Sequence, residues 1–210
     1  MLRGIEINCH SSIKMNKGLV IYIDPFKIDK DYNDADLILI THSHYDHFSE
    51  EDILKVKSTN TKIVITKDLK DKVFELGFNE NNVKVVKPNE KLTIGNVNIE
   101  TIPAYNLNKK FHPKENEWVG YLITISGITY YIAGDTDITE ENKNVKCDVA
   151  LVPVGGTYTM TSQESAELVN TIKPKIAIPT HYGDIVGTMK DGENFKQMLE
   201  PEVNCEILIK

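Results

Sequence analysis

Short apolar runs rich in Ile and Val recur along the chain and are separated by polar stretches that contain turn-forming residues. Runs of four to eight such residues are typical of strands in a buried sheet. The Ser126-Gly127 pair lies between two runs and predicts a hairpin over 120–133. The predicted strands lie near residues 3–8, 19–23, 37–40, 62–66, 83–86, 97–102, 120–126, 128–133, 149–152, 175–179 and 205–209.

Helical patterns lie between several of these strands. Two of them open with a capping-box pattern, Ser49 to Asp52 and Thr161 to Glu164, in which side chains bond the first free backbone N–H groups. The predicted helices cover residues 49–57, 68–76, 161–172 and 191–199. Without a long linker or repeat, this mixture predicts one α/β domain over residues 1–210.

Composition narrows the class of protein. The formal net charge is −7, which argues against broad nucleic-acid binding, since that usually needs a basic surface. No apolar stretch approaches the roughly 18 residues of a membrane span, and MLRGIEINCH lacks the apolar core of a signal peptide. Three scattered cysteines predict a reducing, cytoplasmic setting rather than a disulfide framework.

The stretch THSHYDHFS, residues 41–49, concentrates half of the chain's six histidines directly after an apolar strand. His42 and His44 are two apart, so in extended backbone they point to the same side. Asp46 and His47 follow after the chain turns. Imidazoles and a carboxylate suit zinc, iron or manganese. A solvated polar loop is the alternative, but four ligand-type residues in one loop favour a metal.

Two other strands end in similar residues. One apolar strand ends at Gly134, and Asp135 follows directly. Another apolar strand, in IAIPTH, ends in His181. Taken singly, Asp135 is also explained as a turn residue and His181 as a capping residue. Because strand ends in open α/β sheets carry ligand sites, three such ends predict one shared site.

These motifs, His42-x-His44-x-Asp46-His47 with Gly134-Asp135 and His181, resemble the metallo-β-lactamase-fold hydrolases along nearly the whole chain. The Asp24-Pro25-Phe26 and Gly155-Gly156-Thr157-Tyr158 segments resemble a narrower branch. That branch holds ascorbate-6-phosphate lactonase-like and N-acyl-phosphatidylethanolamine phospholipase D-like proteins. The resemblance implies an α/β fold of the four-layer αββα sandwich type.

The resemblance also implies a ligand set for one or two metal ions, Zn²⁺ first, with Mn²⁺ or Fe²⁺ as other options. His42 and His44 would bind the first metal, Asp135 would bridge, and Asp46, His47 and His181 would bind the second. Asp24 and Thr41 would orient the ligand imidazoles from behind. For Asp24, a turn residue before Pro25 is the alternative.

One position departs from the family pattern. The family supplies a third histidine to the first metal from a Pro-Ala-x-His segment, and here Asn106 stands in that place. His112, six residues on, is a candidate substitute. His10 lies in Cys9-His10-Ser11, which resembles a branch segment near the pocket. Either His10 contacts substrate or it is a turn histidine.

The resulting hypothesis is a metal-dependent hydrolase that attacks an ester, lactone or phosphodiester centre with a metal-activated hydroxide. Asp46 would bind metal and orient the nucleophile, and either His112 or a metal-bound water would protonate the leaving group. Lys110, with its neighbours Lys109 and Lys114, predicts a small anionic substrate, which Asn106 and His10 would also contact. A solvated lysine-rich loop is the alternative.

Three other functions stay open at this point. The fold also hosts nucleases and phosphodiesterases that act on nucleic acid, although the acidic charge argues against them. An iron-dependent oxidoreductase would use similar ligands. A non-catalytic metal-binding protein is conceivable because of Asn106. The oligomeric state is left undefined.

Overall fold

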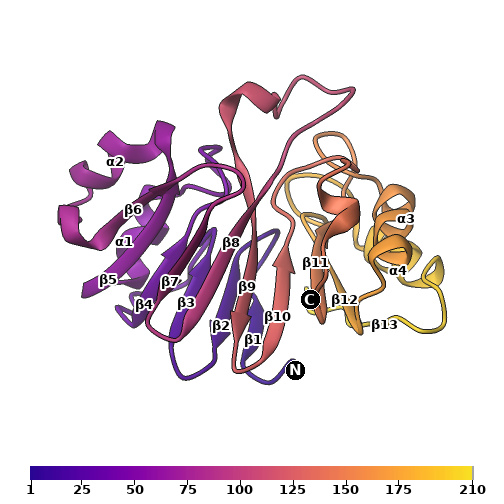
Figure 1. The fold of residues 1–210 in the computed structure, drawn as a ribbon, viewed down its shortest axis with the longest axis horizontal. Helices are drawn as coiled ribbons and strands as arrows, with labels where there is room; N and C mark the ends of the chain where they lie inside the picture. Colours follow the sequence, from indigo (N-terminus) through magenta and orange to yellow (C-terminus); the bar gives the residue numbers. More distant parts are fainter. Residues whose placement is uncertain (210) are drawn as a thin grey trace. The chain divides into compact units, whose positions relative to one another are not determined.

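The computed structural model describes residues 1–209, which form two compact units. The N-terminal unit, Leu2–Lys87, holds a six-stranded sheet and two helices, and the C-terminal unit, Met1 with Pro88 onward, holds a seven-stranded sheet and two helices (Figure 1). The strands of the N-terminal unit are β1 (Ile5–Ile7), β2 (Ile13–Asn16), β3 (Val20–Ile23), β4 (Ala35–Leu39), β5 (Lys57–Thr66) and β6 (Val83–Val86). Its α-helices are α1 (Glu50–Val56) and α2 (Lys70–Glu75).

The N-terminal sheet runs in sequence order from β1 to β6. Strands β1, β2 and β3 pair antiparallel, and β3 to β6 pair parallel with helical crossovers between β4, β5 and β6. Ile38 of β4, Ile40 just after this strand and Ile53 of α1 are fully buried in one apolar cluster. Burial of this side-chain area supplies the main stabilisation of the helix–sheet contact.

Asp52 ties the first turn of α1 to the chain after β3. Its carboxylate accepts hydrogen bonds from the backbone N–H groups of Lys27 and Ile28 at 2.8 and 2.9 Å. Ser49 caps the helix, as its side chain accepts from Asp52 N, and its hydroxyl also donates to the Asp52 carboxylate at 2.7 Å. The predicted helix start is therefore confirmed.

The C-terminal unit contains the strands β7 (Lys91–Ile94), β8 (Val97–Pro103), β9 (Val119–Ile125), β10 (Ile128–Ile132), β11 (Val149–Pro153), β12 (Ile176–Thr180) and β13 (Asn204–Cys205). Its α-helices are α3 (Ser162–Ile172) and α4 (Met189–Gln197). The sheet order is β13-β12-β11-β10-β9-β8-β7, antiparallel from β7 to β10 and parallel from β10 to β13. Helices α3 and α4 pack side by side on the β11–β12 part of the sheet (Figure 1).

The predicted hairpin over 120–133 is present as β9 and β10, and Ser126 and Gly127 form its turn with positive φ values of 52° and 74°. The capping box predicted at Thr161 and Glu164 begins α3. Helix α4 begins two residues before the predicted start, because Thr188 caps it and Asp191 accepts from Thr188 N.

Two strands, β2 and β7, are absent from the sequence prediction, which was wrong at these segments. Each has four residues, of which only two are apolar, so its own pattern is weak. Both segments form strands because they pair with neighbouring strands: β2 lies between β1 and β3, and β7 pairs with β8. The predicted last strand also shrinks to Asn204–Cys205. Among residues 1–209, no helix has the length and apolar character needed to cross a bilayer.

Candidate metal centre

The polar residues of the N-terminal unit leave its sheet at one end of the strands. Register pairs Ile7 with Ile13, Ile13 with Ile23, and Ile23 with Leu39. The turn that carries His10, the residue after β3 and the loop after β4 therefore lie at the same end. The apolar strands bring these segments together, although His10 and His47 are 37 positions apart in the sequence.

Asp24 lies behind this loop and is almost fully buried, with 1% of its surface exposed. Its carboxylate lies 2.7 Å from His47 Nδ1 and accepts hydrogen bonds from Thr41 N at 2.8 Å and Thr41 Oγ1 at 2.7 Å. Burial raises the pKa of Asp24, while the His47 imidazole and the Thr41 donors oppose that rise. With Nδ1 turned toward Asp24, His47 presents Nε2 to the opposite side.

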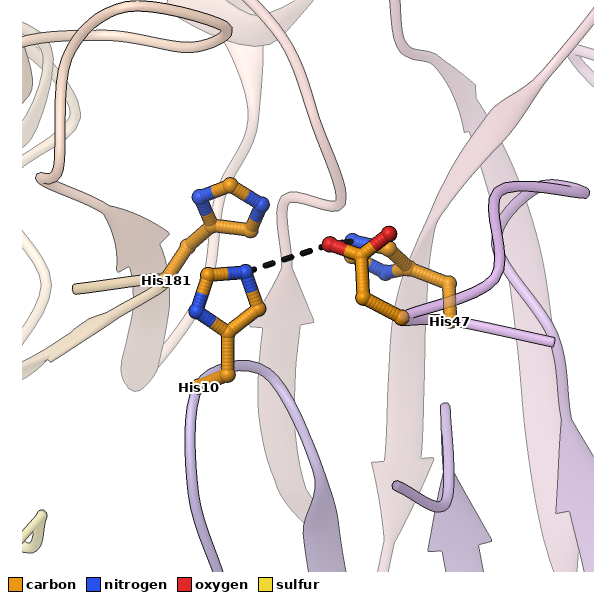
Figure 2. Close-up of side chains that lie close together, drawn as sticks. His10, His47 and His181 are labelled. Atoms are coloured by element: carbon orange, nitrogen blue, oxygen red, sulfur yellow. Dashed lines mark ion pairs between the residues drawn. The ribbon is translucent and has the colours of Figure 1, made fainter. Parts of the chain in front are cut away.

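His10 and Asp46 meet beside that nitrogen. His10 Nε2 lies 3.2 Å from Asp46 Oδ2, the ion pair marked by the dashed line in Figure 2, and His47 Nε2 lies 3.5 Å from the same oxygen. One ligand atom from each of these three residues lies within 4.8 Å of the other two. All three side chains are buried. Two imidazoles and a carboxylate at this spacing fit a divalent cation.

His42 and His44 form a second pair of donors in the same loop. His42 Nε2 and His44 Nδ1 are 3.1 Å apart, and Thr41 Oγ1 lies 3.0 Å from His42 Nδ1. The side-chain direction predicted from the two-residue spacing thus brings two ring nitrogens to one point. A pair of nitrogens at this distance either shares a proton or faces a common cation.

In the C-terminal unit, Asp135 lies between two histidines. Its Oδ2 is 3.0 Å from His181 Nε2 and 3.2 Å from His112 Nε2, and all three residues are at most 4% exposed. Asp135 follows β10 and His181 follows β12, at the same end of this parallel part of the sheet. Gly134, with a positive φ of 65°, makes the turn between β10 and Asp135.

The long loop between β8 and β9 carries His112. Because β8 and β10 both pair antiparallel with β9, the loop leaves the sheet at the same end as Asp135. His112 is held through Asn106, whose Oδ1 accepts from His112 N and faces His112 Nδ1, both at 3.0 Å. The Trp118 ring lies edge-on to the His112 ring, with 5.6 Å between centroids.

Two lysines of this loop contact carboxylates of the protein. Lys109 Nζ lies 2.5 Å from Asp137 Oδ1, and Lys114 Nζ lies 3.0 Å from Glu141 Oε1. These contacts reduce the positive charge that was expected to attract an anionic substrate. Lys110 is exposed.

Two histidines of the candidate centre adopt an unusual backbone conformation. His10 and His181 have φ of 52° and 57°, in the left-handed region that non-glycine residues rarely occupy. Asp24, behind His47, has φ of 47°. Such strain, maintained by surrounding structure, concentrates at functional sites.

The donor chemistry of both units fits transition-metal ions. Each unit presents buried imidazole nitrogens and a carboxylate at strand ends, and Asp24 and Asn106 hold the far side of two of these imidazoles. Sequence reasoning named all of these residues. It did not foresee that His10 contacts Asp46 or that Asn106 contacts His112, because both contacts depend on loop paths.

Comparison with known proteins agrees with this chemistry. A family model described as a β-lactamase superfamily domain matches residues 5–181. A UPF0173 metal-dependent hydrolase of Pyrococcus furiosus is 30% identical, and the match covers 95% of this chain and 93% of that protein. A solved structure of a candidate metal-dependent hydrolase from Parabacteroides distasonis is 34% identical, with a TM-score of 0.85 and coverage of 98% and 93%.

A more distant structure shares the fold alone. CmlA, a diiron β-hydroxylase from Streptomyces venezuelae, is 15% identical with a TM-score of 0.78, and the match covers 98% of this chain but 52% of CmlA. The predicted fold class is confirmed by the two sheets and four helices together with these matches. From its sequence and its fold, the chain belongs to the β-lactamase superfamily and, within it, is a relative of the UPF0173 metal-dependent hydrolases.

Proposed function

We propose that this protein is a metal-dependent hydrolase that cleaves an ester, lactone or phosphodiester bond in a small substrate. The observation that carries the proposal is the Asp135 carboxylate, buried between the Nε2 atoms of His112 and His181. A buried carboxylate oxygen that faces two imidazoles would serve as a ligand for a divalent ion. The activity named for the Pyrococcus relative supports the same class of reaction.

The proposed ligands follow the family pattern, with His112 added. One ion would be held by two nitrogens of the His42–His44 pair, with His112 in place of the missing third histidine. The other would be held by Asp46, His47 and His181, and Asp135 would serve both. This set rests on family membership and on the donor set within each unit.

When bound, divalent ions at such a centre supply Lewis acidity and lower the pKa of water toward about 7. Asp46 orients the attacking water through its carboxylate, and His10 holds that carboxylate at 3.2 Å. Asp24 keeps a proton on His47 Nδ1, which leaves Nε2 as the donor. Of the two roles expected for His112, metal ligand and acid for the leaving group, we propose the first, since its two nitrogens face Asn106 and Asp135.

The substrate is proposed to be small, with a single lysine contact. Lys109 and Lys114 are engaged by Asp137 and Glu141, so Lys110 is the remaining lysine of the loop for a phosphate or carboxylate group. We expect Lys110→Ala to raise KM for anionic substrates and to leave kcat unchanged. A KM that is unaffected by this change would remove the anion preference from the proposal.

Metal content is the first test. Protein purified without added metal should carry one or two equivalents of zinc, manganese or iron by elemental analysis, and a chelator should abolish hydrolysis that zinc then restores. A screen over lactones, phosphodiesters and thioesters identifies the bond that is cleaved. Chelator-resistant hydrolysis would contradict the proposal, and tightly bound iron with oxygen-dependent turnover would replace it by oxidoreductase chemistry.

Ligand variants form the second test. Asp46→Ala and His181→Ala should reduce turnover to background while circular dichroism shows a folded protein. Asp29→Ala is the matched control, because this exposed carboxylate accepts one hydrogen bond from Tyr32 and lies outside the proposed ligand set. Wild-type rates in either ligand variant would refute the assigned ligands.

A further inference from the structure

Asn106 stands where the family usually supplies a histidine ligand, yet its amide is fully engaged within the protein. Its Nδ2 donates to Asp137 Oδ1 at 3.2 Å and to the Tyr158 carbonyl oxygen at 3.0 Å. Its Oδ1 accepts from His112 N and lies 3.0 Å from His112 Nδ1. Asn106 and Asp137 are 8% and 6% exposed.

The partners on one side of the amide fix its orientation. A carbonyl oxygen and an ionised carboxylate only accept hydrogen bonds, so the amide nitrogen of Asn106 must face Tyr158 and Asp137. The amide oxygen must then face His112. That oxygen also only accepts, so His112 must carry its proton on Nδ1. In the neutral ring, Nε2 then carries the lone pair, and it lies 3.2 Å from Asp135 Oδ2. Since a carboxylate oxygen also only accepts, these two atoms fit a proton or a cation between them.

Asp137 is itself held in place. Its Oδ2 accepts from Leu107 N at 2.8 Å, and its Oδ1 lies 2.5 Å from Lys109 Nζ. The Asp137 carbonyl oxygen accepts from Asn142 Nδ2 at 2.8 Å. These contacts set the position of the acceptor that orients Asn106. Lys109 therefore helps to hold the Asp137 carboxylate in place.

We infer that Asn106, backed by Asp137 and Lys109, is a positioning residue that sets the Nδ1–H tautomer and the ring orientation of His112. The inference rests on the proposed metal centre, in which His112 Nε2 is a ligand. In this proposal the ligand is His112, six residues after the position where the family supplies its histidine. Asn106, at that position, holds the side of the His112 ring that faces away from the metal. Outer partners of this kind typically change metal affinity by about ten- to a hundredfold.

The first experiment measures the protonation of the two His112 ring nitrogens in metal-free protein. Long-range proton–nitrogen NMR of histidine-labelled protein should show a proton on His112 Nδ1 in the wild type, and the loss of that proton from part of the molecules in Asn106→Ala. Asn106→Asp keeps an acceptor oxygen toward His112, although it places a carboxylate beside Asp137. It should therefore retain the Nδ1–H tautomer even where its thermal midpoint falls. The matched control is Asn108→Ala, an exposed asparagine of the same loop.

Metal affinity is the second readout, measured by competition with a chelator. Asn106→Ala should weaken binding about ten- to a hundredfold, while Asn106→Asp and Asn108→Ala stay within about threefold of the wild type. A purely structural role predicts instead that affinity follows thermal stability across the variants. A wild-type tautomer together with wild-type affinity in folded Asn106→Ala would overturn the inference. Failure to hydrolyse any substrate would contradict the proposed function and leave the tautomer result intact.

Discussion

A single buried carboxylate, Asp52, connects the first turn of α1 to the chain after β3. It accepts from two backbone N–H groups, from the Ser49 hydroxyl and from Lys55 Nζ at 3.1 Å. Burial pushes the pKa of Asp52 upward, but the hydrogen bonds from Ser49, Lys55 and the backbone together hold it below its ordinary value. Its charged form therefore stabilises the fold.

We predict that Asp52→Asn lowers the free energy of unfolding by about 2 kcal/mol at pH 7, because an amide nitrogen cannot accept these bonds. A depressed pKa in the folded state gives stability above the unfolded pKa of about 3.9, and this stability disappears as pH falls through the folded value. The difference between wild type and variant should thus shrink below about pH 4. Urea unfolding at pH 7, 5 and 3 measures it.

Asp29→Asn is the control for this measurement, since Asp29 is exposed and accepts from the Tyr32 hydroxyl. It should leave unfolding within about 0.5 kcal/mol of the wild type. A gap between wild type and Asp52→Asn that stays constant down to pH 3 would show that the charge is not what stabilises this turn.

Side-chain chemistry by itself identified most of the candidate centre. Four ligand-type residues in THSHYDHFS are a specific signal because a soluble chain rarely buries such groups without a partner. Asn106 carried no comparable signal. Its amide is informative only once Tyr158, Asp137 and His112 surround it, and Tyr158 lies 52 positions away along the chain.

Helix α4 contains a glycine whose role depends on the neighbouring strand end. Gly192 is buried, and an added Cβ would lie 2.6 Å from Tyr182 Oη and 2.7 Å from Tyr182 Cζ. Tyr182 is itself fully buried and directly follows His181. The helix therefore approaches the tyrosine ring closely, and the missing side chain makes room for it.

We predict that Gly192→Ala destabilises the protein by about 1–2 kcal/mol. In an exposed helix the same change stabilises by about 1 kcal/mol, but the overlap with the Tyr182 ring should outweigh that gain. Thermal and urea unfolding provide the measurement. Asn194→Ala, at an exposed position of the same helix, should be neutral or slightly stabilising. Stabilisation by Gly192→Ala would contradict the close packing.

A strand or helix is predicted correctly where its own residues show a clear apolar pattern. Strands with continuous apolar runs, such as β4 and β11, are evident because nearly every position is buried. Strands β2 and β7 have only two apolar residues each, so the sequence signal is weak, and they are strands because they pair with their neighbours in the sheet. Helix α4 was found, but its start was placed two residues late because the capping role of Thr188 was not recognised.

Metal removal tests the chain as a whole. A bound ion should stabilise every segment of the chain that supplies a ligand. At about a hundredfold excess over the dissociation constant, binding adds about 2.7 kcal/mol, which corresponds to a Tm increase on the order of 5–10 °C for a chain of this size. Calorimetry of metal-loaded and chelator-treated protein measures the change.

The same experiment tests the prediction of a single domain over residues 1–210. We expect one calorimetric transition that moves as a whole on metal binding, with the calorimetric enthalpy equal to the van't Hoff enthalpy. Two transitions, of which one alone responds to zinc, would mean that parts of the chain unfold separately and would contradict the prediction of a single domain.

The sequence by itself determined the fold family, most strand and helix positions, and the residue types of the candidate centre, because periodicity and ligand chemistry are local properties. The tertiary structure decided which atoms meet. It brought His10 to Asp46, placed His112 and His181 on either side of Asp135, and turned Asn106 toward His112. These contacts depend on strand register and loop path, which bring together residues that are distant along the chain.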